Sequence, residues 1–70
     1  WVKNEGGGTM FKVGQRVVAV KRIDAAVDRG DVVEITMICI RAGRNFYNAK
    51  KVTDSTVKIT DVPESFLEEQ

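Results

Sequence analysis

The sequence predicts an all-β fold: one five-stranded barrel with a 3₁₀ turn near its C-terminal end. Three observations carry this prediction. The longest stretch of β-forming residues, Val32–Ile40, has apolar residues at alternate positions. Shorter stretches of similar composition lie on both sides of it, and residues that favour turns, mainly Gly, Asn and Asp, separate them. The 70 residues suffice for one small domain.

The segment Arg29–Arg41 contains the central strand of this prediction, around which the other segments are expected to assemble. One set of its alternating positions is apolar throughout: Val33, Ile35, Met37 and Cys39. Because a strand sends every second side chain to the same face, we expect this set to face the core. The opposite set is polar at first and apolar later, which is typical of a strand that bends from one sheet into another.

The N-terminal residues are predicted to lie outside the barrel. Three consecutive glycines, Gly6–Gly8, follow a short polar segment, and no hydrophobic pattern ties them down. We therefore expect residues 1–9 to be a flexible arm or linker and residues 10–70 to form the barrel. The alternative is an arm that places Trp1 on the domain or on a neighbour, against the conformational entropy of the glycines.

Two strands and a loop are expected before the central strand. Phe11–Val13 reads as a short strand, and a turn at Gly14 leads to a second strand, Arg16–Lys21. The four consecutive apolar residues in this second strand indicate cover on both faces. The pattern then breaks, so Arg22–Asp28 is predicted to be a loop, in which a single helical turn would be too short to stand alone.

A hairpin and two further strands follow. The hairpin is predicted at Ala42–Asn45, because Gly and Asn tolerate left-handed backbone conformations. The next strands are Phe46–Val52 and Thr56–Thr60, with a turn at Thr53–Ser55 between them.

The segment Asp61–Leu67 is predicted to close the fold with a 3₁₀ turn. Pro63 fixes its own φ and disfavours an extended ladder. We expect Val62, Phe66 and Leu67 to fold back on the barrel and the last three residues, Glu68 to Gln70, to fray into water.

The composition argues against catalysis and against a metal site. The chain has no His, the commonest general base and metal ligand, and one Cys, too few for a usual zinc site. We expect no enzyme activity, no cofactor and no metal. Cys39 is expected to be buried and inert, which is compatible with a cytoplasmic location. No apolar run approaches the roughly 20 residues that cross a bilayer, so no membrane partner is expected.

Basic and aromatic residues are concentrated in Thr36–Val52, which has no acidic residue. Its cations and rings are Arg41, Arg44, Lys50 and Lys51 with Phe46 and Tyr47. Cations for phosphates and rings for bases are the ingredients of a nucleic-acid surface. The other interpretation is a solvated hairpin whose charges protect a strand edge. The net charge of +1 favours this second interpretation.

Aromatic residues and proline also predict an apolar patch that a partner protein could contact. The patch comprises Phe46, Tyr47, Pro63 and Phe66. The alternative is that the Phe rings complete a small core. Of these residues, we expect Phe66 in the core and Tyr47 on the surface, because the hydroxyl of Tyr prefers water. The acidic residues lie in turns and in the tail, where solvated carboxylates are common.

Three short motifs together resemble the Src-homology-3-like (SH3-like) barrel and span residues 11–67. Arg29–Ile35 is similar to the diverging turn and following strand of that family. Phe46–Ala49 resembles its aromatic pair with a small residue two places on, and Val62–Leu67 its Pro-containing 3₁₀ turn with a trailing aromatic. The absence of Tyr from Val17–Lys21 makes the chain more similar to short-looped bacterial and phage members than to signalling ones.

The resemblance implies a binding function rather than a reaction. In signalling members the groove binds proline-rich peptides, and by position Phe46, Pro63 and Phe66 would line it. We therefore predict a non-enzymatic module that binds another protein or domain through Arg41, Arg44, Phe46, Tyr47, Pro63 and Phe66. The alternative is a nucleic-acid-binding accessory barrel that uses Arg41, Arg44, Lys50 and Lys51.

Overall fold

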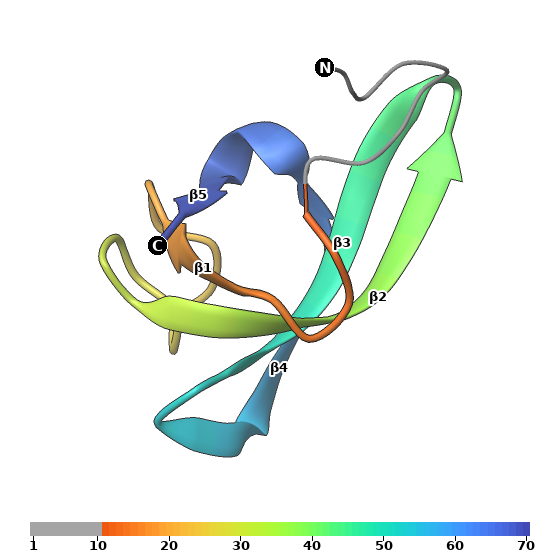
Figure 1. Ribbon diagram of the computed structural model, residues 1–70. Helices are drawn as coiled ribbons and strands as arrows, with labels where there is room; N and C mark the ends of the chain where they lie inside the picture. The colour runs from red at the N-terminus through yellow and green to blue at the C-terminus, as the bar shows by residue number, and fades with distance from the viewer. Residues whose placement is uncertain (1–10) are drawn as a thin grey trace.

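The computed structural model describes residues 11–70, which form five antiparallel strands in one sheet and a 3₁₀ turn, with no α-helix. The elements, shown in Figure 1, are β1 Arg16–Ala19, β2 Val32–Arg41, β3 Arg44–Lys51, β4 Asp54–Pro63, the 3₁₀ turn η2 Glu64–Phe66, and β5 Leu67–Glu69. The predicted all-β class, the strand number and the C-terminal 3₁₀ turn are confirmed. The predicted arm, residues 1–9, lies outside the described residues, as does Met10.

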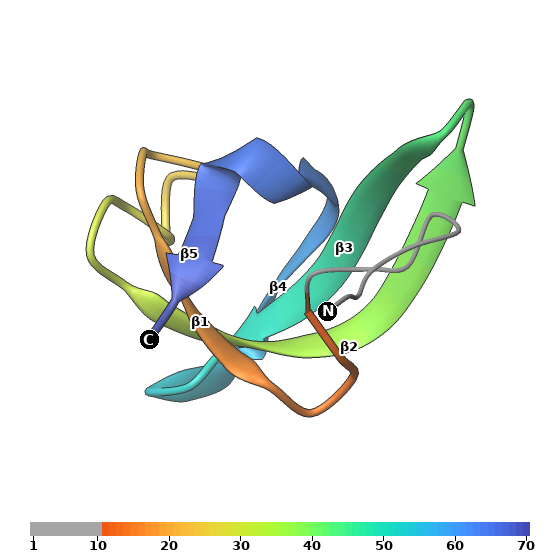
Figure 2. The same ribbon diagram turned by 45° about the horizontal axis from the view of Figure 1, so that its top comes forward.

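The strands are ordered β4-β3-β2-β1-β5, and the sheet is strongly curved. Figure 2 shows that β2 bends along its length, pairing with β1 over its first half and extending with β3 beyond β1 over its second half. Within residues 11–70 no pairing joins the edge strands β4 and β5, so closure of the barrel stays a prediction. This part of the chain contains no helix of the length and apolar composition that crossing a membrane requires.

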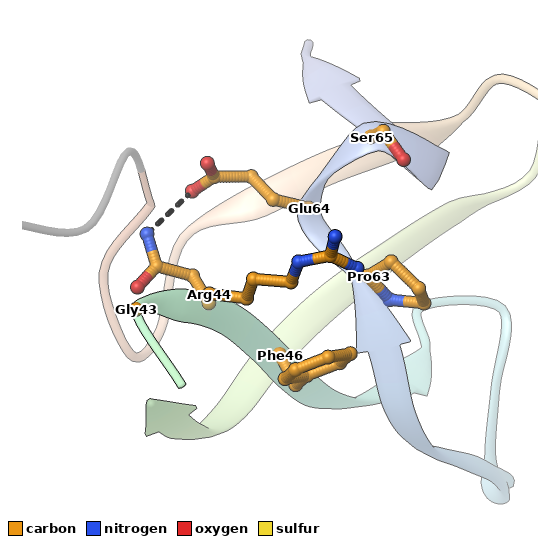
Figure 3. Close-up of a pocket in the computed structure, with 7 residues that line it drawn as sticks. Gly43, Arg44, Phe46, Pro63, Glu64 and Ser65 are labelled. Atoms are coloured by element: carbon orange, nitrogen blue, oxygen red, sulfur yellow. Dashed lines mark hydrogen bonds between the residues drawn. The ribbon is translucent and has the colours of Figure 1, made fainter. Parts of the chain in front are cut away.

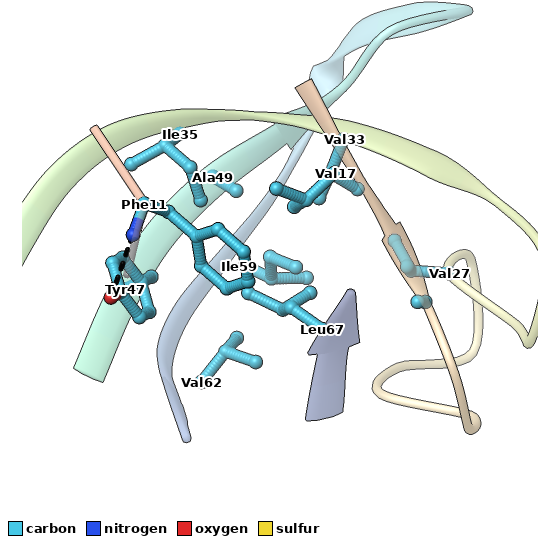
Figure 4. Packing of buried hydrophobic residues seen from close by; sticks show 11 residues of the cluster. Phe11, Val17, Val27, Val33, Ile35, Tyr47, Ala49, Ile59, Val62 and Leu67 are labelled. Carbon is cyan, nitrogen blue, oxygen red and sulfur yellow. Dashed lines mark hydrogen bonds between the residues drawn. The ribbon is translucent and has the colours of Figure 1, made fainter. Parts of the chain in front are cut away.

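The core fills the inner side of the curved sheet. Its buried side chains come from every strand, from the segment before β1 and from the loop before β2: Phe11, Val17, Ala19, Val27, Val33, Ile35, Tyr47, Ala49, Ile59, Val62 and Leu67 (Figure 4). The rings of Phe11 and Tyr47 are the two largest, and their centroids lie 5.3 Å apart in a tilted arrangement. Tilted aromatic pairs add to the stabilisation from buried area.

The predicted core face of the central strand is correct in its first half and wrong in its second. Val33 and Ile35 are buried, but Met37 is 53% exposed and Cys39 only partly buried. A bulge between Ile35 and Met37 adds one residue to β2, which reverses the faces of all later residues. Ile38, opposite Tyr47, packs against the core instead.

The segment before β1 is not the short strand that was predicted. Phe11 is fully buried, and the chain turns at Val13 and Gly14 before β1 begins at Arg16. The Gly14 N–H donates to the Ile35 carbonyl at 2.7 Å, which holds this turn against β2. The second predicted strand is also shorter, because β1 ends at Ala19.

Glu68 and Glu69, which were predicted to fray together with Gln70, belong to the short strand β5 instead. Residues Leu67–Glu69 pair with β1, with Ala19 opposite Leu67 and Val17 opposite Glu69. Leu67 is buried while Glu68 and Glu69 are exposed. The strand therefore protects the open edge of β1, whose backbone groups would otherwise be unpaired.

The predicted loop between β1 and β2 is confirmed, and a lysine from β3 ties it down. Lys51 donates to the Ala26 carbonyl at 2.9 Å and lies 3.5 Å from the Asp31 carboxylate. The pKa of Asp31 is lowered, first by the hydrogen bond that it accepts from the Asp28 N–H and then by Lys51. Because the pKa of Asp31 is lowered, the ionised carboxylate stabilises the fold at neutral pH through these contacts. That stabilisation is lost as the pH falls through the folded-state pKa of Asp31.

The hairpin between β2 and β3 turns at two residues, Ala42 and Gly43, and β3 begins at Arg44. Both turn residues have positive φ, 53° and 76°, as a type I′ turn requires. The left-handed positions were predicted for Gly and Asn, yet Ala42 occupies the first of them. The next turn, at Val52 and Thr53, is shorter than predicted, and β4 runs from Asp54 to Pro63.

Replacing Ala42 by Asn is expected to stabilise the protein by about 0.5–1 kcal/mol, because Asn tolerates positive φ better than Ala does. The urea midpoint should rise without a change in the m-value. The control is Ala42→Val, which places a β-branched residue at positive φ and should lower the midpoint. An unchanged or lower midpoint for Ala42→Asn contradicts the strain that we assign to this turn.

Candidate functional site

A groove of about 400 Å³ lies where β3 and β4 part. The two strands pair as far as Phe46 opposite Pro63, and the chain then leaves β4 for η2. Proline, which has no N–H, is suited to such an end of a ladder. The walls come from the start of β3 and from η2: Gly43, Arg44, Asn45 and Phe46 with Pro63, Glu64 and Ser65 (Figure 3).

The inner wall of the groove is fixed by hydrogen bonds to one carboxylate. Glu64 Oε2 accepts from the Tyr47 hydroxyl at 2.5 Å and from the Asn45 side-chain amide at 3.2 Å. The Tyr47 oxygen in turn accepts a long hydrogen bond, 3.4 Å, from the Phe11 N–H. Hydrogen bonds to an ionised acceptor are among the stronger ones. This network joins η2, β3 and the segment before β1.

Tyr47 was predicted to be exposed, and this prediction is wrong: the residue is fully buried. Alternation along β3 places Tyr47 and Ala49 on the inner face, and the polar tip of Tyr47 is satisfied by Glu64 instead of water. Tyr47 therefore positions the groove from below and does not contact a partner.

The outer wall is built around Phe46, which is partly buried. The Arg41 guanidinium lies 4.6 Å from the centre of the Phe46 ring and 3.0 Å from the Asp61 carboxylate. Asp61 has a φ of 54°, and its N–H donates to the Asn48 side-chain oxygen at 3.0 Å. An exposed ion pair contributes little to stability, but here it directs Arg41 across the ring.

Arg44 differs from Arg41 because it has no carboxylate within ion-pair distance among residues 11–70. It is exposed and lies directly opposite Arg41 in the β2–β3 register. A second pair of like charges, Lys50 opposite Lys58, lies on the same outer face of the sheet. Like charges directly opposite each other are unfavourable. The outer face therefore carries positive charge that the described chain only partly neutralises.

The structure thus brings together four of the six predicted partner-binding residues: Arg41, Arg44, Phe46 and Pro63. Tyr47 lies beneath them. Phe66 is partly buried against the core, with the Lys21 ammonium 4.5 Å from its ring centre, and is not part of the groove.

Of the four cations predicted for nucleic acid, Lys51 is engaged with the loop before β2. Sequence reasoning missed Asn45, Glu64 and Ser65. Their role depends on contacts between η2 and the start of β3, for which no local pattern exists.

Within residues 11–70 no group of three or more His, Cys, Asp or Glu side chains could hold a metal ion. No protein family, curated protein or solved structure matches this chain.

Tyr47→Phe is expected to lower the free energy of unfolding by about 1–3 kcal/mol, because it removes the hydrogen bonds that the Tyr47 hydroxyl makes with Glu64 and with the Phe11 N–H. Urea unfolding measures the change, with Ser65→Ala, at an exposed residue of η2, as the control. A loss no larger than that of the control contradicts the role of this network in holding η2.

Arg44→Gln is expected to raise the free energy of unfolding by about 0.2–0.5 kcal/mol, because it removes a like-charge pair. The gain should shrink at high salt, where exposed charges are screened. The matched control is Arg29→Gln, which changes the net charge equally in the loop before β2. A loss of stability in Arg44→Gln, or an equal gain in the control, contradicts repulsion between Arg41 and Arg44.

Proposed function

We propose that this chain is a non-enzymatic protein-interaction module that binds a partner protein at the groove and at the adjoining outer face of β2 and β3. One observation carries the proposal: the groove combines partly exposed apolar side chains, Phe46 and Pro63, with the cation Arg44 at its rim, which has no ion pair within residues 11–70. Aromatic residues and Arg are the residues enriched at protein interfaces and at their energetic centres.

Contacts that hold both walls of the groove support the proposal. Arg41 holds Phe46 from outside, and Glu64 holds η2 from inside through Tyr47 and Asn45. Binding to side chains that are already ordered loses less conformational entropy than binding to mobile ones. A volume of about 400 Å³ accommodates a few side chains of a partner segment.

The order of elements supports an SH3-like barrel as the scaffold, with the 3₁₀ turn between the last two strands. A proline-rich ligand is less well supported than another segment. Recognition of a polyproline helix depends on grooves lined by several aromatic side chains. Here Tyr47 is buried and Phe66 lies outside the groove, so Phe46 is its one aromatic wall among the described residues.

Nucleic-acid binding is the second candidate, favoured by the two cationic pairs on the outer face, Arg41 with Arg44 and Lys50 with Lys58. Such pairs attract phosphates as well as carboxylates. Less favourable to nucleic-acid binding is the net charge of +1, which gives the chain no overall attraction for phosphates.

Site-specific photo-crosslinking in the cells that produce the protein tests the proposal. A photoreactive residue, p-benzoylphenylalanine, replaces Ser65 in the groove or, as a matched control, Ser55 at the far end of β4. Position 65 is expected to yield a discrete protein adduct that is lost when Phe46→Ala is added, and position 55 is expected to yield none.

Two results contradict the proposal. One is an adduct of equal yield from both positions. The other is an adduct that disappears on nuclease treatment, which would support the nucleic-acid candidate instead. Circular dichroism of Phe46→Ala excludes unfolding as the cause of a lost adduct, and Arg44→Gln, which we expect to be stable, serves as the second groove variant.

A further inference from the structure

We infer that the partner segment is acidic: a short extended stretch in which an apolar side chain lies on Phe46 and Pro63 and a neighbouring carboxylate pairs with Arg44. This inference rests on the proposed function and names the chemistry of the partner. It follows from the way apolar and cationic residues alternate across the outer face of the sheet.

The register places an apolar row across three strands. Cys39 on β2 pairs with Phe46 on β3, and Phe46 pairs in turn with Pro63 on β4. All three are partly buried, and Met37, 53% exposed, continues the apolar surface along β2. A partner side chain that covers this row removes apolar area from water.

Cationic rows lie on both sides of this apolar row. β3 has no bulge, so Arg44, Phe46 and Lys50 point to the same face. Arg44, which pairs with Arg41, precedes Phe46 by two residues, or about 7 Å along the strand. Lys50, which pairs with Lys58, follows Phe46 by four residues, or about 13 Å. A partner with carboxylates on both sides of an apolar residue fits this spacing.

The cations on this face have an incomplete set of counter-charges within the described chain. Asp61 pairs with Arg41, and Glu34 lies beside Lys50 in the register, but Arg44 and Lys58 have no ion pair among residues 11–70. Each is opposite another cation. Because like charges repel, a partner carboxylate gains attraction and also relieves that repulsion.

The negative charge of Glu64 does not face an acidic partner bound at the outer side of the groove. Its carboxylate is directed to the inner side of the groove, toward Asn45, while Arg44, Phe46 and Pro63 form the other side (Figure 3). The inner side of the groove therefore carries the negative charge of Glu64, and the outer side carries the positive charge of Arg44.

An acidic protein segment fits this face better than single-stranded nucleic acid does. Phosphates and carboxylates would both pair with the cations of this face, so the apolar row is what distinguishes the two partners. The apolar row offers contact to aliphatic side chains, which nucleic acid does not supply.

Amide NMR titrations of the whole chain test the inference. The probe is the capped heptapeptide Gly-Glu-Asp-Leu-Phe-Asp-Gly, and its matched control replaces Glu by Gln and Asp by Asn. We expect the acidic peptide to shift the signals of Gly43, Phe46 and Ser65 and to bind about tenfold more tightly than the neutral one, with affinity falling as salt rises.

Variants assign the effect to Arg44. Arg44→Gln is expected to weaken binding of the acidic peptide about fivefold or more, as expected for loss of a charge pair. Arg29→Gln, with the same net charge, should leave the affinity unchanged. Equal affinity for both peptides, or equal weakening in both variants, overturns the inference. So does tighter binding of oligo(dT) than of the acidic peptide at the same signals.

This experiment separates the inference from the proposed function. If position 65 still crosslinks a protein in cells while neither peptide shifts the groove signals, the site binds a partner of other chemistry and only the inference fails. If the crosslink is also absent, both fail.

Discussion

The hydrogen bond from the buried Tyr47 hydroxyl to Glu64 is the interaction on which the site depends. It joins the middle of β3 to η2 across 17 residues of sequence, and the Phe11 N–H completes the connection to the start of the described chain. Without a partner the Tyr47 hydroxyl would be a buried polar group, which is unfavourable. One network therefore satisfies the core and holds the inner wall of the groove in place.

The bulges in β2 and β4 determine what the outer face presents. In β2 the extra residue moves Met37 and Cys39 from the core to the outer side, next to Phe46. In β4 the irregularity opposite Asn48 places Asp61 in a left-handed conformation from which it reaches Arg41. Without the bulge in β2, Met37 and Cys39 would face the core. Bulges that redirect side chains beside a site are a recurrent device in β-sheets.

Several features of the hairpin end are unfavourable for stability. Arg41 lies opposite Arg44, and Ala42 takes a conformation that favours Gly or Asn. Strained backbone and unpaired charge concentrate at functional sites, where selection for binding outweighs selection for stability. Their coincidence with the groove is consistent with the proposed binding role.

Local sequence determined the class and the placement of most strands, because alternation and turn residues act over a few positions. Pro63 likewise marked the 3₁₀ turn, since its ring restricts the backbone by itself. Long-range contacts decided the rest: the Tyr47 hydroxyl can be buried because Glu64 accepts its hydrogen bond, and β5 forms because β1 offers it an edge. The groove needs two segments nearly 20 residues apart in the chain, and only packing brings them together.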